Sequence, residues 1–393
     1  MSIPSVDDFD RWIRDRFKAH NTRLETLYFE QADRADVASV GDDIKAQLRD
    51  EGAALIARVA AEPRLHADDA RNYDLLGNVG LYMAAMRRHE LTNPAREKRS
   101  PFPVASALAQ RLAVGLGVAP RFATAHINLS NLAHGVEHKS FTRLDDELLF
   151  IEYNCLSILG YIRAADTLRR IGPLGVGHPV TLALLRDAQA ALERVVAANA
   201  ELDRRLDVDR FFYNVRPYFK PYRVGRTEYR GANAGDFAAI NEVDLMLGLC
   251  GVKDAAYTSM LLEKLPFMPR QDQGLLQDAC RQGSLLDGFI EATAAGPLHD
   301  GLRRNMAAFL DVCAAHGRIA AQHHDLFVRR FIEEPSTAMS GRHLAQITAS
   351  GPPLQVLVGA LEVLRDKRLA ADRPGIESRF ADIARLKAAA LAS

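Results

Sequence analysis

Apolar residues recur three and four positions apart along much of the chain, which is the spacing of one face of an α-helix. Residues 43–61 and 183–207 show this pattern clearly. The longest such stretch, 302–334, would make about nine helical turns if it were unbroken. Runs of β-branched residues are scarce, and only 223–230 has the composition of a short extended segment. The pattern therefore predicts an all-α protein.

A polar, proline-bearing segment, TNPAREKRSPFP at 92–103, interrupts the helical pattern. We predict a boundary there, with a small N-terminal helical domain over 1–104 and a large helical domain over 105–393. Two further segments, 216–236 and 335–353, are rich in glycine, proline and small polar residues. Loops of this length in a helical protein often carry function, although they could equally do no more than connect helices.

The composition is that of a globular protein, with 48% hydrophobic and 25% charged residues among 393. Fifty basic residues balance fifty acidic ones, which argues against a nucleic-acid partner. The four cysteines form no Cys-x-x-Cys pair, so a disulfide framework or a structural zinc site is not expected. Neither a signal peptide nor an apolar run of about 20 residues is evident, so we expect a cytoplasmic protein without a membrane partner.

Several enzyme classes are excluded by absent motifs. The chain has no glycine-rich dinucleotide or phosphate loop, no Gly-x-Ser-x-Gly elbow and no His-Glu-x-x-His. The Glu-x-x-His pattern of di-iron bundles and the Cys-x-x-Cys-His pattern of covalent haem attachment are also missing.

Two adjacent histidines, His323 and His324, lie in the longest predicted helix. Positions three, four and seven residues from His324 hold small or apolar side chains, so its imidazole is predicted to face inward. His323 is predicted to lie closer to the polar edge of the helix. A neutral imidazole in an apolar cavity is a natural axial ligand for haem iron. The alternative is a core histidine that is satisfied by a backbone carbonyl.

A second candidate site combines one arginine with aromatic residues. Arg216 stands within FFYNVRPY at 211–218, and the small, flexible segment GANAGD follows at 231–236. A guanidinium in an aromatic setting suits capture of a carboxylate beside a flat ring. A short run of small residues lets the backbone approach a planar ligand. The alternatives are an aromatic core patch with a salt-bridged arginine, and a plain turn.

Four blocks of sequence together resemble a known family. They are VGLYMAAMRRHELTNP at 79–94, LGVAPRFATAHINLSN at 116–131, KSFTRLDDELLFIEYNCLSILG at 139–160, and FFYNVRPYFKPYRVGRTEYRGANAGDFAAINEVDLMLGL at 211–249. The chain resembles the monodechloroaminopyrrolnitrin synthase-like family, and more distantly indoleamine 2,3-dioxygenase. Both belong to a superfamily of histidine-ligated haem enzymes that act on indoles and related aromatics. The resemblance extends discontinuously over about residues 70–365.

The resemblance implies a role for individual residues. His324 matches the proximal haem ligand, and Arg216 matches the arginine that pairs with a substrate carboxylate. Phe211 and Phe212 match paired phenylalanines on the substrate side. The remaining matches are a distal serine at Ser157, small residues beside the haem at Asn233 and Ala234, and a loop that closes over substrate and haem at Ser350-Gly351. Ser157 and Arg216 are thus the candidate catalytic residues, and Met339-Ser340-Gly341 is an alternative closing loop.

By this resemblance the protein is expected to be an indoleamine 2,3-dioxygenase-like helical bundle that binds haem b without a covalent link. It would be an oxygenase that uses dioxygen or peroxide on an indole or related, amino acid-like aromatic substrate, as a monomer or homodimer. Two alternatives stay open. One is a non-catalytic haem- or indole-binding protein, and the other is a haem-free helical interaction module.

Overall fold

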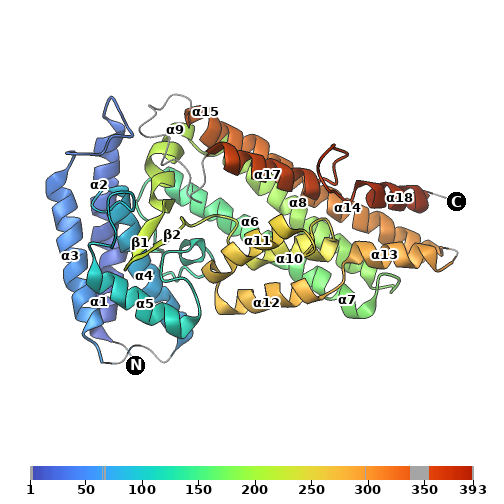
Figure 1. The fold of residues 1–393 in the computed structure, drawn as a ribbon, viewed down its shortest axis with the longest axis horizontal. Helices are drawn as coiled ribbons and strands as arrows, with labels where there is room; N and C mark the ends of the chain where they lie inside the picture. Colours follow the sequence, from blue (N-terminus) through green and yellow to red (C-terminus); the bar gives the residue numbers. More distant parts are fainter. Residues whose placement is uncertain (1–2, 64, 66–67, 297, 337–353, 392–393) are drawn as a thin grey trace.

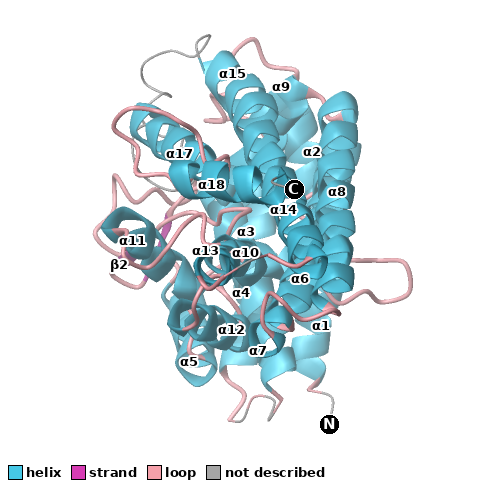
Figure 2. Ribbon diagram, turned by 90° about the vertical axis from the view of Figure 1, so that its right-hand side faces the viewer, coloured by secondary structure: helices cyan, strands magenta, loops and turns pink. Residues whose placement is uncertain are grey.

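A computed structural model describes residues 3–63, 65, 68–296, 298–336 and 354–391. Helices dominate it, and the one sheet among these residues is an antiparallel hairpin of β1 (Tyr222–Val224) and β2 (Thr227–Tyr229) (Figure 2). Tyr222 pairs with Tyr229 in this hairpin, which begins one residue before the segment 223–230 that was predicted to be extended. The all-α prediction is confirmed.

The N-terminal helices form one end of the molecule, on the left of Figure 1. They are α1 (Pro4–Trp12), the π-helical turn η1 (Ile13–Phe17), α2 (Lys18–Phe29), α3 (Asp42–Ala60), α4 (Asp69–Arg88) and α5 (Pro103–Leu116). Packing is close here: a Cβ on Gly80 of α4 would lie 2.6 Å from the backbone nitrogen of Phe122. The predicted helix at 43–61 corresponds to α3.

Local sequence explains where α5 begins and ends. Pro103 occupies its first turn, where a missing N–H costs no helical hydrogen bond, and Gly117 follows in the left-handed conformation with φ 68°. The polar segment 92–103 leads into this helix. The hydrophobic core of the N-terminal helices also takes in Val215, Tyr218 and Tyr222 from further along the chain. The division into domains at 104 and 105 stays a prediction.

Long helices form the other end of the molecule. α6 (Asp145–Arg169) packs against α8 (Thr181–Arg205) and α10 (Ala238–Leu247), and α8 packs against α14 (Asp300–Gln322). Gly160 lets α6 and α8 approach each other, because a Cβ there would lie 2.4 Å from a methyl group of Val195. The predicted helix at 183–207 corresponds to α8.

The predicted long helix at 302–334 is α14 followed by the π-helix η6 (His323–Glu333) and the short α15 (Glu334–Ser336). The chain ends with α17 (Leu354–Arg368) and α18 (Phe380–Leu391). The remaining elements are η2 (Thr124–Ile127), α7 (Ile171–Leu174), α9 (Val208–Arg210), η3 (Phe211–Val215), η4 (Arg216–Phe219), α11 (Ala255–Lys264), η5 (Leu265–Phe267), α12 (Arg270–Arg281) and α13 (Leu285–Ala294).

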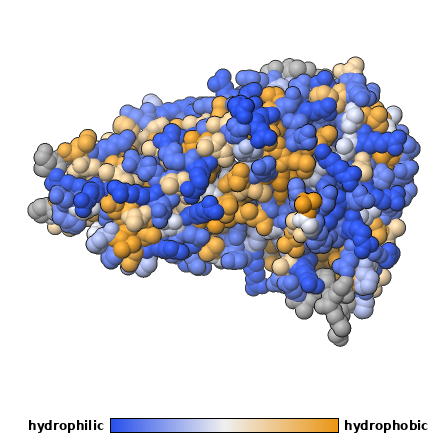
Figure 3. Space-filling view, turned by 180° about the vertical axis from the view of Figure 1, so that it is seen from behind, coloured by the Kyte–Doolittle hydropathy of each residue, from blue (hydrophilic) through white to orange (hydrophobic). Residues whose placement is uncertain are grey.

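One helical stretch in the described part of the chain, Asp145–Leu174, is long and apolar enough by composition to cross a membrane. A core helix of a globular protein passes the same test, and α6 within this stretch packs against α8 and α10. On the face opposite to that of Figure 1, hydrophobic side chains form separate groups among hydrophilic ones (Figure 3).

Candidate functional site

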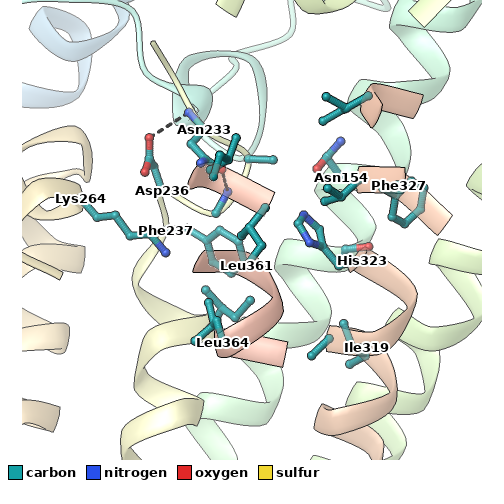
Figure 4. Close-up of a pocket in the computed structure, with 18 of the residues that line it drawn as sticks. Asn154, Asn233, Asp236, Phe237, Lys264, Ile319, His323, Phe327, Leu361 and Leu364 are labelled. Carbon is teal, nitrogen blue, oxygen red and sulfur yellow. Dashed lines mark hydrogen bonds between the residues drawn. The ribbon is translucent and has the colours of Figure 1, made fainter. Parts of the chain in front are cut away.

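A cavity of about 520 Å³ lies among the long helices and the loop before α10. Its volume falls within the range of about 300–1,000 Å³ that is typical of ligand and cofactor sites. Aromatic and aliphatic side chains make up most of its wall, and they come from α6, α8, η3, η4, α10, α14, η6 and α17 (Figure 4). Such a wall favours a ligand that is large and mostly apolar.

Helix α6 contributes a polar stripe to this cavity. Asn154, Ser157 and Tyr161 lie three and four residues apart, so they share one face of the helix, and all three line the cavity. The hydroxyl of Ser157 donates a hydrogen bond to Oδ1 of Asn199, at 3.3 Å. The predicted site residue Ser157 therefore lies on the cavity wall.

The segment η3–η4 places Phe211 and Arg216 on the wall. The ring of Phe211 packs against Phe150, with centroids 5.0 Å apart, and against Phe331 at 5.8 Å. Phe212 is buried behind this surface, and the guanidinium of Arg216 lies 5.6 Å from the centre of its ring. Phe212 thus supports Arg216 and does not itself line the cavity.

Arg216 has no carboxylate partner among the described residues, and the segment 337–353 contains neither aspartate nor glutamate. Burial lowers the pKa of its guanidinium to about 10. The side chain still carries its charge at neutral pH. A half-buried cation without an ion-pair partner is stabilised by an anionic ligand.

The loop before α10 also reaches the cavity, where Asn233 and Ala234 line it. Hydrogen bonds fix the loop in place. Thr124 donates its hydroxyl to the Asn233 carbonyl at 2.7 Å, and the Asn233 backbone N–H donates to the Asp236 carboxylate at 2.9 Å. Arg230 holds the same carboxylate through two bonds of 2.9 Å. The predicted site residues Asn233 and Ala234 thus lie beside the cavity.

The two adjacent histidines occupy different environments, and His323 is the one that lines the cavity. Its imidazole extends from η6 toward Leu361 on the facing helix (Figure 4). Its side chain is exposed where the cavity opens, but the protein around the ring desolvates it and lowers its pKa to about 4, so the ring is neutral at physiological pH. Neither ring nitrogen forms a hydrogen bond to another described residue. His323 therefore offers the cavity a free lone pair.

His324, which was predicted to face inward as the ligand, is buried at 7% exposure but does not line the cavity. Its Nδ1 atom lies 2.9 Å from the carboxylate of Asp325 and 3.1 Å from the guanidinium of Arg365. Its Nε2 atom has no hydrogen-bond partner among the described residues. His324 is thus buried, as the helical-face prediction had it, and His323 is exposed, but the residue on the cavity wall is His323.

The π-helix η6 carries both histidines. It begins at His323, and a π-helix closes its hydrogen bonds from residue i to i+5, so each turn takes in more residues than an α-turn. His324, Val328 and Phe331 are its buried residues. Phe327, Val328 and Phe331 line the cavity together with His323. Both histidines thus lie next to the apolar side of η6, and His323 is the one that reaches the cavity wall.

A buried polar network lies beside the cavity and ties four helices together. Tyr161 donates its hydroxyl to Nδ1 of His316 at 3.2 Å, and Nε2 of His316 donates to Asp244 at 2.7 Å. Arg368 of α17 binds both oxygens of Asp244, at 2.8 and 2.6 Å. Although burial opposes ionisation, Arg368 and His316 hold the pKa of Asp244 below its usual value. The network fixes α17 over the cavity.

Sequence reasoning missed Lys264, the last residue of α11, which also lines the cavity. Its ammonium group donates to Oδ1 of Asn241 at 3.3 Å, and burial lowers its pKa to about 8. A single lysine at the end of a short helix belongs to no motif, so no sequence signal marks it. The predicted residue Gly351 and the two candidate closing loops at 339–341 and 348–353 lie outside the described residues.

The donor set suits a metal that is carried by a planar organic cofactor. No three His, Cys, Asp or Glu side chains in the described part of the chain gather into a cluster that could hold a bare metal ion. A single neutral imidazole beside a large apolar cavity fits haem, whose macrocycle supplies the other four ligands and needs one axial nitrogen. The residues of the cavity therefore fit the cofactor that the sequence resemblance implies.

Comparison with known families matches residues 4–390, nearly the whole chain, to the family model described as Monodechloroaminopyrrolnitrin synthase PrnB. This family implies a haem-dependent oxygenase that acts on an indole-type substrate. The resemblance seen in the four sequence blocks is confirmed. The chain belongs to the monodechloroaminopyrrolnitrin synthase PrnB family.

Proposed function

We propose that this protein binds haem b in the cavity, with His323 as the proximal ligand, and oxidises an aromatic substrate whose carboxylate is held by Arg216. The observation that carries the proposal is the free, neutral imidazole of His323 on the wall of an apolar cavity. The haem would supply the activation of dioxygen or peroxide. The protein supplies position, polarity and the exclusion of water.

The preference for His323 over His324 rests on which of the two rings reaches the cavity. Axial ligation needs a nitrogen lone pair that is directed at open space. The imidazole of His323 lines the cavity and has no hydrogen-bond partner among the described residues. His324 also has a free nitrogen, Nε2, but its Nδ1 contacts Asp325 and Arg365, and the residue lies off the cavity wall. We therefore assign the proximal position to His323 and a supporting contact with α17 to His324.

Arg216 supports an anionic, aromatic substrate. Its planar guanidinium can bind a carboxylate through two parallel hydrogen bonds, and its lack of a partner leaves that geometry available. Phe211 and Phe150 lie on the same part of the wall and can contact a flat ring. The combination favours a compound in which a carboxylate is attached to an indole or a similar ring.

Ser157 is suited to the ring nitrogen of such a substrate. Because its O–H donates to Asn199, its oxygen keeps a free lone pair that can accept a hydrogen bond from an indole N–H. Ser157 would thereby position the ring, while Arg216 positions the carboxylate. Asn199 is itself held by Gln322, through a bond of 3.4 Å.

A matched pair of variants tests the proposal. His323→Ala and His324→Ala are loaded with haem, and their absorption spectra are recorded before and after reduction and addition of carbon monoxide. His323→Ala is expected to lose the stoichiometric Soret band and its carbon monoxide shift, while His324→Ala keeps both.

If His324→Ala loses the Soret band and His323→Ala keeps it, the axial ligand is His324. A wild-type protein that takes up no haem would overturn the whole proposal and favour a haem-free module. Consumption of dioxygen or peroxide by the haem-loaded wild type, with a panel of indole carboxylates, then separates an oxygenase from a non-catalytic carrier.

A further inference from the structure

Five cationic side chains line the cavity, and three of them are neutralised within the protein. Arg230 pairs with Asp236 at 2.9 Å, Arg365 with Asp366 at 2.8 Å and Arg368 with Asp244 at 2.6 Å. Arg216 and Lys264 have no carboxylate within 4.0 Å among the described residues. The acidic residues on the wall are Asp236, which is already paired, and Glu263, which is exposed. The cavity therefore has two positive charges to share with ligands.

These two charges lie on different elements and in different surroundings. Arg216 belongs to η4, beside Phe211 and Phe150. Lys264 ends α11, and Figure 4 shows its side chain reaching in beside Phe237, from the side of the cavity opposite to His323. A substrate carboxylate can pair with one of these two side chains. The other side chain can then pair with a second anion.

The surroundings of Lys264 form a prepared site for that anion. Its ammonium group has a single hydrogen bond, to the amide of Asn241, which leaves two of its three protons free. A Cβ on Gly235 would lie 3.6 Å from Nζ, so the ammonium lies directly against the backbone of the cavity loop. The nearby Asp236 is occupied by Arg230 and by the Asn233 N–H. Lys264 therefore has two donors that a ligand in the cavity can use.

Haem b carries two carboxylate side chains, so the proposed cofactor would bring an acceptor that Lys264 lacks within the protein. We propose that Lys264 binds a carboxylate of the haem, while Arg216 is left for the substrate. This inference rests on the proposed function. It divides the two unpaired cations of the cavity between cofactor and substrate.

The test compares two probes, haem and its dimethyl ester, in which both carboxylates are blocked. Each is titrated into the wild type and into Lys264→Met and Lys264→Arg, and affinity is read from the Soret band. Lys264→Met should weaken haem binding about tenfold to a hundredfold, the effect expected for one charge-assisted hydrogen bond, and Lys264→Arg should recover most of it. The ester should bind the wild type and Lys264→Met equally.

Two results would overturn the inference. One is unchanged haem affinity in Lys264→Met. The other is a loss that persists with the ester, which would mean that the methionine disturbs the fold. Thermal unfolding of the unloaded proteins checks this second case independently, because removal of an unpaired buried charge should leave the midpoint equal or raise it.

A third titration separates haem from substrate. Haem-loaded wild type, Lys264→Met and Arg216→Met are titrated with tryptophan and with indole, which lacks the carboxylate. Arg216→Met should lose the preference for tryptophan, and Lys264→Met should keep it. Loss of that preference in Lys264→Met would assign the lysine to the substrate and overturn the inference. If the wild type binds no haem, the proposed function itself has failed.

Discussion

Arg88, which is buried, and Arg216, which is half-buried on the cavity wall, show how the packed N-terminal region differs from the cavity. Arg88 binds both oxygens of Glu25 at 2.7 Å and also the carbonyl of Tyr213 at 2.9 Å. Burial alone would lower the pKa of Arg88, yet Glu25 raises it above its usual value. Arg216, three residues after Tyr213, has no such partner, and burial lowers its pKa to about 10. Arg88 is neutralised by a carboxylate of the protein, whereas Arg216 remains available to pair with the carboxylate of a ligand.

The largest effect should follow from breaking the packed pair. Glu25→Ala leaves Arg88 charged, buried and unpaired, which should lower the free energy of unfolding by about 3–5 kcal/mol. Arg216→Met should change it by less than about 1 kcal/mol, because no ion pair is lost. Urea unfolding of both variants measures the difference. Equal losses in the two variants would remove the distinction between the two arginines.

Backbone packing should give the next largest effect. Gly80→Ala puts a methyl group 2.6 Å from the backbone nitrogen of Phe122, and overpacking of this kind costs about 1–3 kcal/mol. Gly115→Ala in α5 is the matched control, because no atom lies within 4 Å of its new methyl group. That control should stabilise the protein by about 0.4–1 kcal/mol. A Gly80→Ala variant as stable as its control would show that the N-terminal packing is loose.

The charge of Lys264 should give haem binding a dependence on pH. The pKa of Lys264 in the haem-free protein is about 8, and a bound carboxylate raises this pKa. The contribution of Lys264 to haem binding is therefore complete below pH 8. It is lost as the pH rises from 8 through the pKa of Lys264 in the haem-bound protein. Affinity should fall by up to about tenfold per pH unit above 8, which corresponds to about 1.4 kcal/mol. Soret titrations of carbon monoxide-bound haem from pH 7 to 9.5 measure this.

Lys264→Arg is the control for the pH series, because arginine stays protonated throughout that range. Its haem affinity should be flat with pH. If the haem affinity of the wild type is as independent of pH as that of Lys264→Arg, haem binding does not depend on the charge of Lys264.

The smallest effect should come from the neutral polar stripe on α6. Ser157→Ala should weaken the binding of an indole carboxylate by about 0.5–1.5 kcal/mol, since one neutral hydrogen bond to the ring N–H is lost. The N-methylated analogue has no such hydrogen, so its affinity should be the same in both proteins. A Ser157→Ala variant that weakens both ligands equally would show that the hydroxyl acts on packing and not on the ring nitrogen.

The fold class and the long helices could be predicted from the sequence because amphipathic periodicity reports them directly. The stretch at 302–334 was predicted as one helix, and α14, η6 and α15 occupy it. Arg216, Asn233 and Ala234 could be singled out because a cation among aromatics and a run of small residues are unusual local patterns, and Ser157 was named by the family resemblance. All four line the cavity.

The parts that sequence reasoning missed depend on the backbone and on distant partners. The helical-face argument placed His324 inward, and it is buried, but which of the two histidines reaches the cavity depends on how η6 packs in the folded chain. The position of Lys264 depends on how α11 packs beside the loop at 231–236, and its lack of a partner depends on Arg230 occupying Asp236. Properties of this kind belong to the folded molecule and cannot be assigned to a short segment of sequence.

The π-helix at η6 has a consequence for comparing this chain with its homologues. A π-helical turn holds an additional residue, so a relative that lacks one position in 323–333 would return toward the α-helical path. Its side chains beyond the deletion would rotate relative to the cavity. Alignment columns alone therefore do not show which of two adjacent histidines reaches the cavity, and the helical period around them has to be compared as well.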